Sequence, residues 1–406
     1  MPKYLFIDFM MLISTVLRFR HQIDNFNRVH YEKKKKNPKC KKRPRFFLNI
    51  SVIAMGSFRI KVPASSANIG PGFDVLGVGL NLYLEIFVKV DPSLDTSNEE
   101  YNVKISYEGD NQGFVSLRAS KNLISSTALY ILRCNGIHSF PNGTEIKVIN
   151  PIPLGRGLGS SASAIVGGII LGNEIGNLKL SKRRLLDYCL MIERHPDNIS
   201  AAMLGGFVGS YLNELSDEES KAKNVPLDFI LPREDTPKGK IVSQQPPVGI
   251  CEYLQYEWAI EIKCVAVIPE FEVSTHAARE VLPSSYSRDD IVFNLQRLAI
   301  LTSALTQSPP NNNFIYEAMR DKIHQPYRST LIPGLQEVLN CVTPKSDPGL
   351  CGICLSGAGP TILCLATKDF ESIAQKVINI FKKANVKCSW KLLTVAKDGA
   401  TVDYLD

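Results

Sequence analysis

The chain has 406 residues, of which 44% are hydrophobic and 21% are charged, as is ordinary for a globular protein large enough for two domains. Its net charge of +7 is concentrated at one end, because residues 1–54 carry 13 Lys/Arg against 3 Asp/Glu and the rest carry 34 against 37. The slightly acidic body gives no reason to expect nucleic-acid binding.

The first 54 residues are predicted to be a disordered basic extension outside the fold. The apolar run 4–19 is short and is interrupted by Asp8, so it predicts neither a membrane span nor a secretory signal. The basic run 33–45 is compatible with a nuclear address or a phosphate-backbone patch. A sharper hypothesis is that translation starts at Met55, just before the first recognisable motif.

Ten cysteines are scattered without the spacing of a disulfide framework. Cys351 and Cys354 form a pair, but a zinc site needs a second pair or nearby histidines, and the sequence supplies neither. This usage favours a reducing compartment, so we expect a cytoplasmic protein without a membrane partner.

From residue 55 onward, alternating and apolar patterns predict the first elements. These are strands at 58–62, 82–90, 103–107 and 143–148 and a helix at 121–134. The segment 63–74 is rich in small residues and predicts a shaped loop, in which Asn68 and Asp74 would form turn-stabilising contacts. Asn122 stands where an N-cap is expected.

A glycine-rich segment at 151–163 separates the last of these strands from a buried helix predicted at 162–175. Its three glycines, at 155, 157 and 159, let the backbone bend and approach a ligand closely. The unpaired N–H groups of the helix start favour an anion, and Ser160 and Ser161 add hydroxyls there. A phosphate site is therefore predicted, although glycines and serines alone also fit a tight strand-to-helix turn. The segment lacks the lysine of a Walker A loop.

The remaining elements follow in order. They are a helix at 181–194 capped by Ser181, a turn and strand at 201–212, an irregular proline-bearing stretch at 213–256, a strand at 258–269, helices at 273–283 and 288–307, a helix ending before Pro326, a glycine loop at 355–361, a helix at 369–384 and a final strand at 386–395. The expected organisation is an N-terminal domain at 55–220, an irregular connection at 221–257 and a C-terminal domain at 258–406.

The string Pro-x-x-x-Gly-Leu-Gly-Ser-Ser-Ala resembles the nucleotide loop of the GHMP kinases, the superfamily of galactose, homoserine, mevalonate and phosphomevalonate kinases. From about residue 57 the chain looks most similar to the homoserine kinase branch, with a weaker patch at 213–256. The resemblance implies an α+β, two-domain GHMP kinase fold. Its N-terminal domain would resemble ribosomal protein S5 domain 2, and its C-terminal domain would be ferredoxin-like.

The resemblance also implies residue roles for an ATP-dependent phosphorylation of L-homoserine. Nucleotide contacts fall on Pro153, Leu154, Gly155, Arg156, Gly157, Leu158, Gly159, Ser160, Ser161 and Ala162, with Asn122 near the adenine. Mg²⁺ would lie at Glu193 and Ser161, a ligand set that suits an ion which keeps waters and phosphate oxygens. Substrate contacts fall on Asn68, Asp74, His195, Thr275, Arg279 and Arg328, with Asp74 suited to the ammonium and the two arginines to the carboxylate.

Asn198 falls where the mevalonate kinase branch carries a catalytic-base aspartate. Since an asparagine cannot take up the proton, catalysis is predicted to work by alignment and charge neutralisation, with the hydroxyl proton moving towards the γ-phosphate. Two alternatives stay open: another GHMP small-molecule kinase, or a catalytically silent ligand sensor of this fold. The family habit implies a homodimer.

Overall fold

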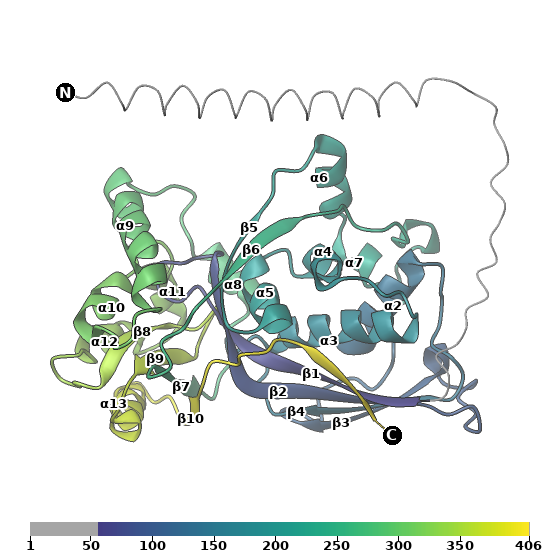
Figure 1. Ribbon diagram of the computed structural model, residues 1–406, viewed down its shortest axis with the longest axis horizontal. Coiled ribbons are helices and arrows are strands. Elements are labelled where there is room, and N and C mark those ends of the chain that lie inside the picture. The colour runs from purple at the N-terminus through teal and green to yellow at the C-terminus, as the bar shows by residue number, and fades with distance from the viewer. Residues whose placement is uncertain (1–55, 406) are drawn as a thin grey trace, which may run out of the picture. The chain divides into compact units, whose positions relative to one another are not determined.

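The computed structural model describes residues 56–405, and these residues contain two β-sheets (Figure 1). The predictions for residues 1–54 and for a start at Met55 lie outside these described residues. No helix among residues 56–405 is both long and apolar enough to cross a membrane.

The larger sheet has seven strands, and its central path runs β11-β1-β2-β4-β3, with β5 pairing with both β2 and β6. All pairs are antiparallel except β3 with β4. The strands are β1 (Gly56–Ala67), β2 (Leu76–Val90), β3 (Val103–Gly109), β4 (Thr144–Asn150), β5 (Phe207–Leu212), β6 (Cys251–Tyr256) and β11 (Thr401–Leu405). A register shift between Pro63 and Ala64 carries β1 on into the first motif.

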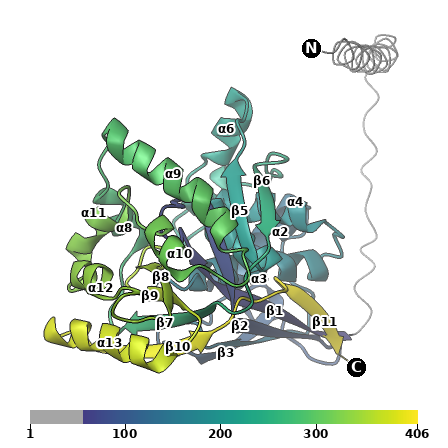
Figure 2. The same cartoon turned by 60° about the vertical axis from the view of Figure 1, so that its left-hand side comes forward.

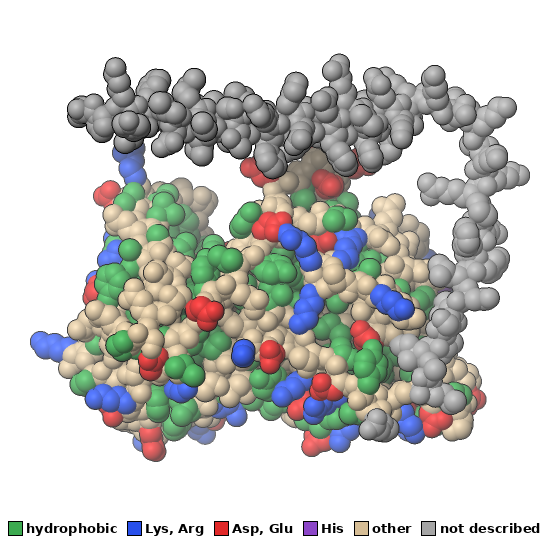
Figure 3. All heavy atoms as spheres, viewed as in Figure 1, with side chains coloured by type: hydrophobic (Ala, Val, Ile, Leu, Met, Phe, Trp, Pro, Cys, Tyr) green, Lys and Arg blue, Asp and Glu red, His purple; other side chains and the backbone are tan. Residues whose placement is uncertain are grey.

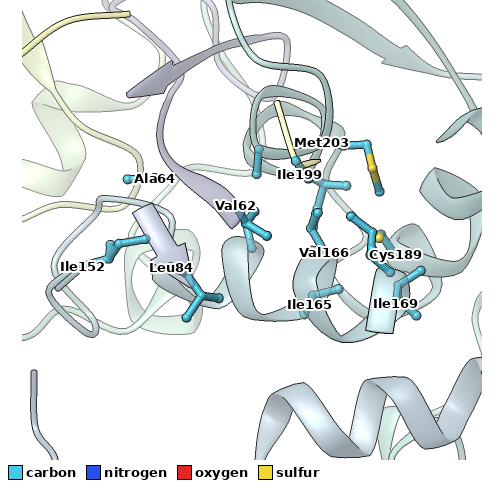
Figure 4. Close-up of a cluster of buried hydrophobic side chains, with 14 of the residues drawn as sticks. Val62, Ala64, Leu84, Ile152, Ile165, Val166, Ile169, Cys189, Ile199 and Met203 are labelled. Atoms are coloured by element: carbon cyan, nitrogen blue, oxygen red, sulfur yellow. The ribbon is translucent and has the colours of Figure 1, made fainter. Parts of the chain in front are cut away.

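Helices α2 (Leu123–Cys134), α3 (Ser160–Ile175), α4 (Lys182–Ile192) and α5 (Pro196–Leu204) are packed together beside this sheet. Figure 4 shows the core that results, with Val62 and Leu84 from the strands facing Ile165 and Val166 of α3. Because α3 is buried along most of its length, the glycine loop that precedes it is attached to a fixed support.

The smaller sheet has four antiparallel strands in the order β10-β7-β9-β8. Its strands are β7 (Lys263–Pro269), β8 (Leu350–Leu355), β9 (Ile362–Ala366) and β10 (Cys388–Leu393), and the helices among them are α8 (Thr275–Glu280), α9 (Arg288–Ala304), α10 (Asn312–Ala318), α11 (Gln325–Arg328), α12 (Leu335–Cys341) and α13 (Phe370–Lys383). This βαββαβ order is the ferredoxin-like topology that the family resemblance implies.

Both faces of the smaller sheet are covered, which explains why β7 is an almost continuous apolar run. Val265 and Val267 pack with α12 and α13, whereas Cys264 and Ala266 belong to the cluster that includes residues of α9 and α10. Figure 2 shows α13 along one side of this sheet and α9 and α10 above it.

Several predicted element bounds are wrong. Residues 63–67 were expected in a loop but extend β1, since the small residues still pair with β2. Residues 201–204 were expected in a turn but complete α5, which begins at Pro196 because proline fits a first helical turn. For the same reason Pro326 lies inside α11 instead of following a helix.

The strand predicted at 258–269 begins only at Lys263, after a turn. The strand predicted to be last is followed by β11, which returns to pair with β1 of the first sheet. The stretch 221–257, expected to be irregular, contains two short elements besides β6. They are α7 (Leu227–Ile230) and the 3₁₀ turn Lys238–Lys240, which follow α6 (Asp217–Lys223).

Candidate active site

The glycine loop has the geometry that its sequence predicts. Gly155, Gly157 and Gly159 all have positive φ, and Gly159 occupies the N-cap position of α3 in the left-handed region. A Cβ on Gly157 would lie 2.3 Å from the carbonyl oxygen of Ser356, and one on Gly159 would lie 2.0 Å from Ser65 Oγ. Glycine is therefore required at these positions for two reasons, conformation and space.

A small cavity opens at the start of α3, and it collects predicted residues from distant parts of the chain. Its walls are Gly155, Arg156, Gly157, Gly159, Ser160, Ser161, Ala162, Glu193, Asn198, Val273, Thr275, Gly357, Ala358 and Gly359. Ser161 is exposed in the first turn of α3, whereas Pro153 and Leu158 are buried and brace the loop from behind. The backbone amides and hydroxyls at this helix start can bind an anion.

The glycine loop at 355–361 supports the cavity from the opposite side. Ser356 Oγ lies 2.5 Å from the carbonyl oxygen of Gly157 and 2.7 Å from Ser66 Oγ. The Gly357 amide donates to the Ala67 carbonyl at 3.1 Å. The glycine loop at 355–361 thus packs on the segment 63–74 and on the glycine loop before α3 together.

A second cavity adjoins the first and shares Gly155, Ser160 and Ser161 with it. Asn122 lies in its wall with its side chain engaged, since Oδ1 accepts the Ile124 amide at 3.0 Å and caps α2. Phe114, 91% exposed, stands in the same wall. The two cavities together offer a polar pocket beside a more apolar one, which suits a phosphate tail joined to a flat ring.

Glu193 lies where α4 ends and faces the first cavity. Burial, reinforced by the charge of Asp197, raises the pKa of Glu193 to about 8. Among residues 56–405 no hydrogen bond or ion pair engages this carboxylate. The Glu193 carboxylate is thus half-buried, has no partner in the described part of the chain and lies in one cavity with the Ser161 hydroxyl. These two groups fit a hard divalent cation that takes its remaining ligands from water and phosphate.

The predicted substrate residues converge beside the first cavity. Arg279 Nη2 donates to Asp74 Oδ1 at 2.6 Å, although the two residues are 205 positions apart. The guanidinium carbons of Arg279 and Arg328 lie 5.4 and 5.3 Å from the centre of the Phe73 ring. Thr275, four residues before Arg279 on α8, connects this group to the phosphate cavity. Two cations and one carboxylate so close together are groups that can bind the two charges of a small zwitterion.

Comparison with known proteins identifies relatives of this chain. Residues 122–206 match the family model of the GHMP kinases N terminal domain. The chain is 66% identical over 353 residues to homoserine kinase of Candida albicans, covering 86% of this chain and 98% of the relative, and 58% identical over 355 residues to that of Saccharomyces cerevisiae, covering 86% and 99%. The chain belongs to the homoserine kinase family.

The fold agrees with that of a homoserine kinase crystal structure from Cytophaga hutchinsonii, with a TM-score of 0.65 at 24% identity over 90% of this chain and 100% of that one. The predicted α+β GHMP kinase fold is therefore confirmed. On the face of the protein that Figure 3 shows, Lys/Arg and Asp/Glu side chains are interspersed.

Three predicted residues are engaged within the protein. Asn68 is 3% exposed, and its amide accepts from the Asp74 N–H at 3.1 Å and donates to the Gly357 carbonyl at 3.0 Å. Asn198 Oδ1 accepts from Ser65 Oγ at 2.9 Å. Arg328 is 2% exposed, and burial with the nearby charge of Arg279 lowers its pKa to about 10. These three side chains therefore also hold neighbouring segments of the protein together.

His195 lies at the N-cap of α5, half-buried, and burial with the charge of Arg279 lowers its pKa. The next acidic residue, Asp197, was not singled out from the sequence. It is 4% exposed, and burial with the charge of Asp74 raises its pKa to about 7. Phe73 was also missed, although an aromatic residue directly before Asp74 in a glycine-rich loop could have indicated it.

Proposed function

We propose that this protein catalyses the transfer of the γ-phosphoryl group of ATP to the hydroxyl of L-homoserine, giving O-phospho-L-homoserine and ADP, a step of threonine biosynthesis. The observation that carries the proposal is the juxtaposition described above: a cavity at a glycine-flanked helix start adjoins two arginines and one aspartate that meet at Phe73. The names of its relatives, homoserine kinases at 66% and 58% identity, support the choice of substrate.

The ATP phosphates are assigned to the backbone amides of residues 155–162, with Ser161 in contact, and the adenine to the adjoining cavity that includes Asn122. The loop carries no lysine, so Arg156, which lines this cavity, would supply the positive field together with the backbone donors and the helix dipole. Glu193 and Ser161 would hold Mg²⁺. When bound, this ion neutralises charge on the phosphate oxygens.

When homoserine binds, its charged groups would replace the ion pair between Arg279 and Asp74. Its ammonium group binds Asp74 and its carboxylate binds Arg279 and Arg328, so each protein charge keeps a partner of opposite sign. Thr275 lines the first cavity, His195 lies close enough to Arg279 and Asp74 for their charges to shift its pKa, and Asn68 holds Asp74 in place. Two arginines on one small acid favour an amino acid over a sugar.

We assign no general base. Asn198 lines the cavity but its amide cannot accept a proton, and Glu193 is assigned to the metal. The residues therefore act by holding the hydroxyl in line with the γ-phosphate while the proton passes to a phosphate oxygen.

The direct test is ADP release in a coupled assay with L-homoserine, mevalonate or galactose as acceptor. Homoserine-dependent ADP formation, with little for the other two, is expected. Turnover of mevalonate or galactose instead would assign another GHMP small-molecule kinase, and binding of homoserine without ADP formation would assign a ligand sensor.

We further propose that the protein is a cytoplasmic homodimer with an ATP-binding domain at 55–220 and a C-terminal domain at 258–406. The nine cysteines of the described residues are all free, which suits a reducing compartment. Helix α9 exposes four apolar residues, namely Ile291, Val292, Leu295 and Ile300, and exposed apolar residues suit contact with a second copy of the chain. Sedimentation velocity on the wild type and on a Leu295→Glu variant would test the dimer.

A further inference from the structure

One buried histidine has no role in the reaction as proposed. His324 is fully buried at the N-cap of α11. Its Nε2 lies 2.8 Å from the carbonyl oxygen of Gly70 in the first motif, and its Nδ1 lies 3.3 Å from Arg328 Nη1. The ring thus bridges the loop that carries Asp74 and one of the two arginines.

These two contacts define the protonation state of the ring. A carbonyl oxygen can only accept, so Nε2 must carry the hydrogen. A guanidinium can only donate, so Nδ1 must be bare. His324 is therefore neutral, with its hydrogen on Nε2, and burial lowers its pKa in the direction that keeps it neutral.

The surroundings hold the ring in this orientation. The Asp321 carboxylate accepts the backbone amides of Ile323, His324 and Gln325 at 2.7–3.0 Å and the Asn294 amide at 2.8 Å. One of its oxygens also lies 3.5 Å from His324 Nε2. On one face, the Phe73 ring stacks on the imidazole with centroids 5.4 Å apart and an angle of 24°.

The Arg328 side chain makes three hydrogen bonds within the protein, each with a different segment. Its Nε donates to the Ala278 carbonyl at 3.0 Å, and Nη1 donates to the Gly357 carbonyl at 2.8 Å and to His324. An arginine has five N–H donors, so these bonds leave the two on Nη2. Among residues 56–405 no acceptor is found for Nη2, which leaves it available to a ligand.

We propose that neutral His324 is a positioning residue that directs the free Nη2 edge of Arg328 at the carboxylate of the substrate. The inference rests on the proposed function, because it assumes that Arg328 binds that carboxylate. His324 accepts one Nη1 hydrogen and so fixes the rotation of the guanidinium, while its bond to Gly70 ties that orientation to the loop bearing Asp74.

Three substitutions separate the two ring nitrogens. His324→Phe keeps the stacking on Phe73 but loses both hydrogen bonds. His324→Asn places an amide oxygen near the position of Nδ1 and can still accept from Arg328, whereas His324→Gln places an amide N–H near the position of Nε2 and keeps only the bond to Gly70. We expect His324→Phe to raise the KM for homoserine about tenfold or more, since a charged hydrogen bond is lost, with the KM for ATP changed less than about twofold. His324→Asn should recover most of this loss and His324→Gln little of it.

A carboxylate-free acceptor, 2-amino-1,4-butanediol, separates positioning from general damage. The wild type should prefer homoserine strongly in kcat/KM, and His324→Phe should shrink this preference about tenfold, because only homoserine uses Arg328. The exposed His138 supplies the control: His138→Phe should leave both KM values and the preference unchanged.

Equal loss for both acceptors, an equal rise in the two KM values, or better recovery by His324→Gln than by His324→Asn would overturn the inference. If His324→Phe does not fold, as circular dichroism would show, the comparison of the Asn and Gln variants decides. A wild type that does not phosphorylate homoserine at all would instead refute the proposed function.

Discussion

At the scale of single residues, the candidate site consists of charged side chains that lie close together. Asp74 and Arg279 neutralise each other at 2.6 Å, whereas Glu193 and Asp197 are carboxylates with raised pKa values. A buried carboxylate costs free energy when it is charged unless a cation compensates it. The two carboxylates are therefore the residues whose ionisation responds most to ligands and to pH.

Replacing Glu193 by Gln should lower kcat by at least about a hundredfold at ordinary Mg²⁺ concentration, because a charged group that orients the nucleotide is lost. The Mg²⁺ concentration for half-maximal activity should rise. Steady-state kinetics with Mg²⁺ titration measures both, and Glu214→Gln, an exposed residue, serves as the control. Full activity of Glu193→Gln with unchanged Mg²⁺ dependence would show that the metal assignment is wrong.

Asp197 should make the free energy of unfolding depend on pH. Its pKa is about 7 in the folded chain against 3.8 as the ordinary value, so between these values the folded state binds more protons than the unfolded state. Below about pH 4, Asp197 makes its full contribution to the free energy of unfolding. This contribution, at most about 4 kcal/mol, is lost as the pH rises through 7.

Asp197→Asn should remove this loss, and its gain in stability over the wild type should grow from pH 4.5 to pH 8. Urea unfolding at the two pH values measures the difference, and Glu193 contributes a change of the same sign in both proteins. An equal stability difference at both pH values would contradict the assignment.

At the scale of elements, the glycine loop before α3 lies in close contact with a second glycine loop, at 355–361. The two loops are about 200 residues apart in the chain. Gly157 lies against the Ser356 carbonyl, and Ser356 also contacts Ser66. Three segments therefore meet at Ser356, and the conformation of the loop is fixed by its neighbours as well as by its own sequence.

Gly157→Ala should weaken nucleotide binding at least about tenfold, because the added Cβ would lie 2.3 Å from a backbone oxygen and φ is +81°. Gly136→Ala is a matched control, since Gly136 has φ +80° with no atom within 4 Å of the added Cβ. It should lower stability by about 1 kcal/mol through backbone strain alone, without affecting nucleotide affinity. Isothermal titration with ADP and thermal unfolding separate the two effects, and equal ADP affinity in both variants would refute the steric explanation.

At the scale of the whole molecule, the two ends of the described chain are joined in one sheet. β11 pairs with β1 along residues 57–61, after the chain has passed through the smaller sheet. The Arg59 guanidinium also contacts Asp403 at 2.8 Å, and the Tyr404 hydroxyl donates to Glu174 at 2.6 Å. β11 is therefore the strand that covers the outer side of β1, and α3 packs on β1.

Deleting residues 401–406 should lower the free energy of unfolding by more than about 2 kcal/mol, because a strand with its side-chain contacts is lost. Asp403→Asn, which removes only the exposed ion pair, should leave stability nearly unchanged. Urea denaturation curves of the two variants provide the measurement. A deletion as stable as the wild type would show that β11 contributes nothing to the fold.

The sequence by itself determined the features that are encoded locally. The glycine spacing at 155, 157 and 159 specifies positive φ before a helix, Ser181 caps α4 as predicted, and the alternating runs mark most strands. Neighbouring residues decide each of these, because φ, capping and burial periodicity act over a few positions.

The tertiary structure alone decided the rest. Four contacts join residues that are far apart in the chain. They are the pairing of Arg279 with Asp74, the approach of two arginines to Phe73, the return of β11 to β1 and the bridge made by His324. No local pattern specifies such contacts, since they depend on which surfaces the packed sheets and helices bring together, and the raised pKa values of Glu193 and Asp197 arise from the same burial.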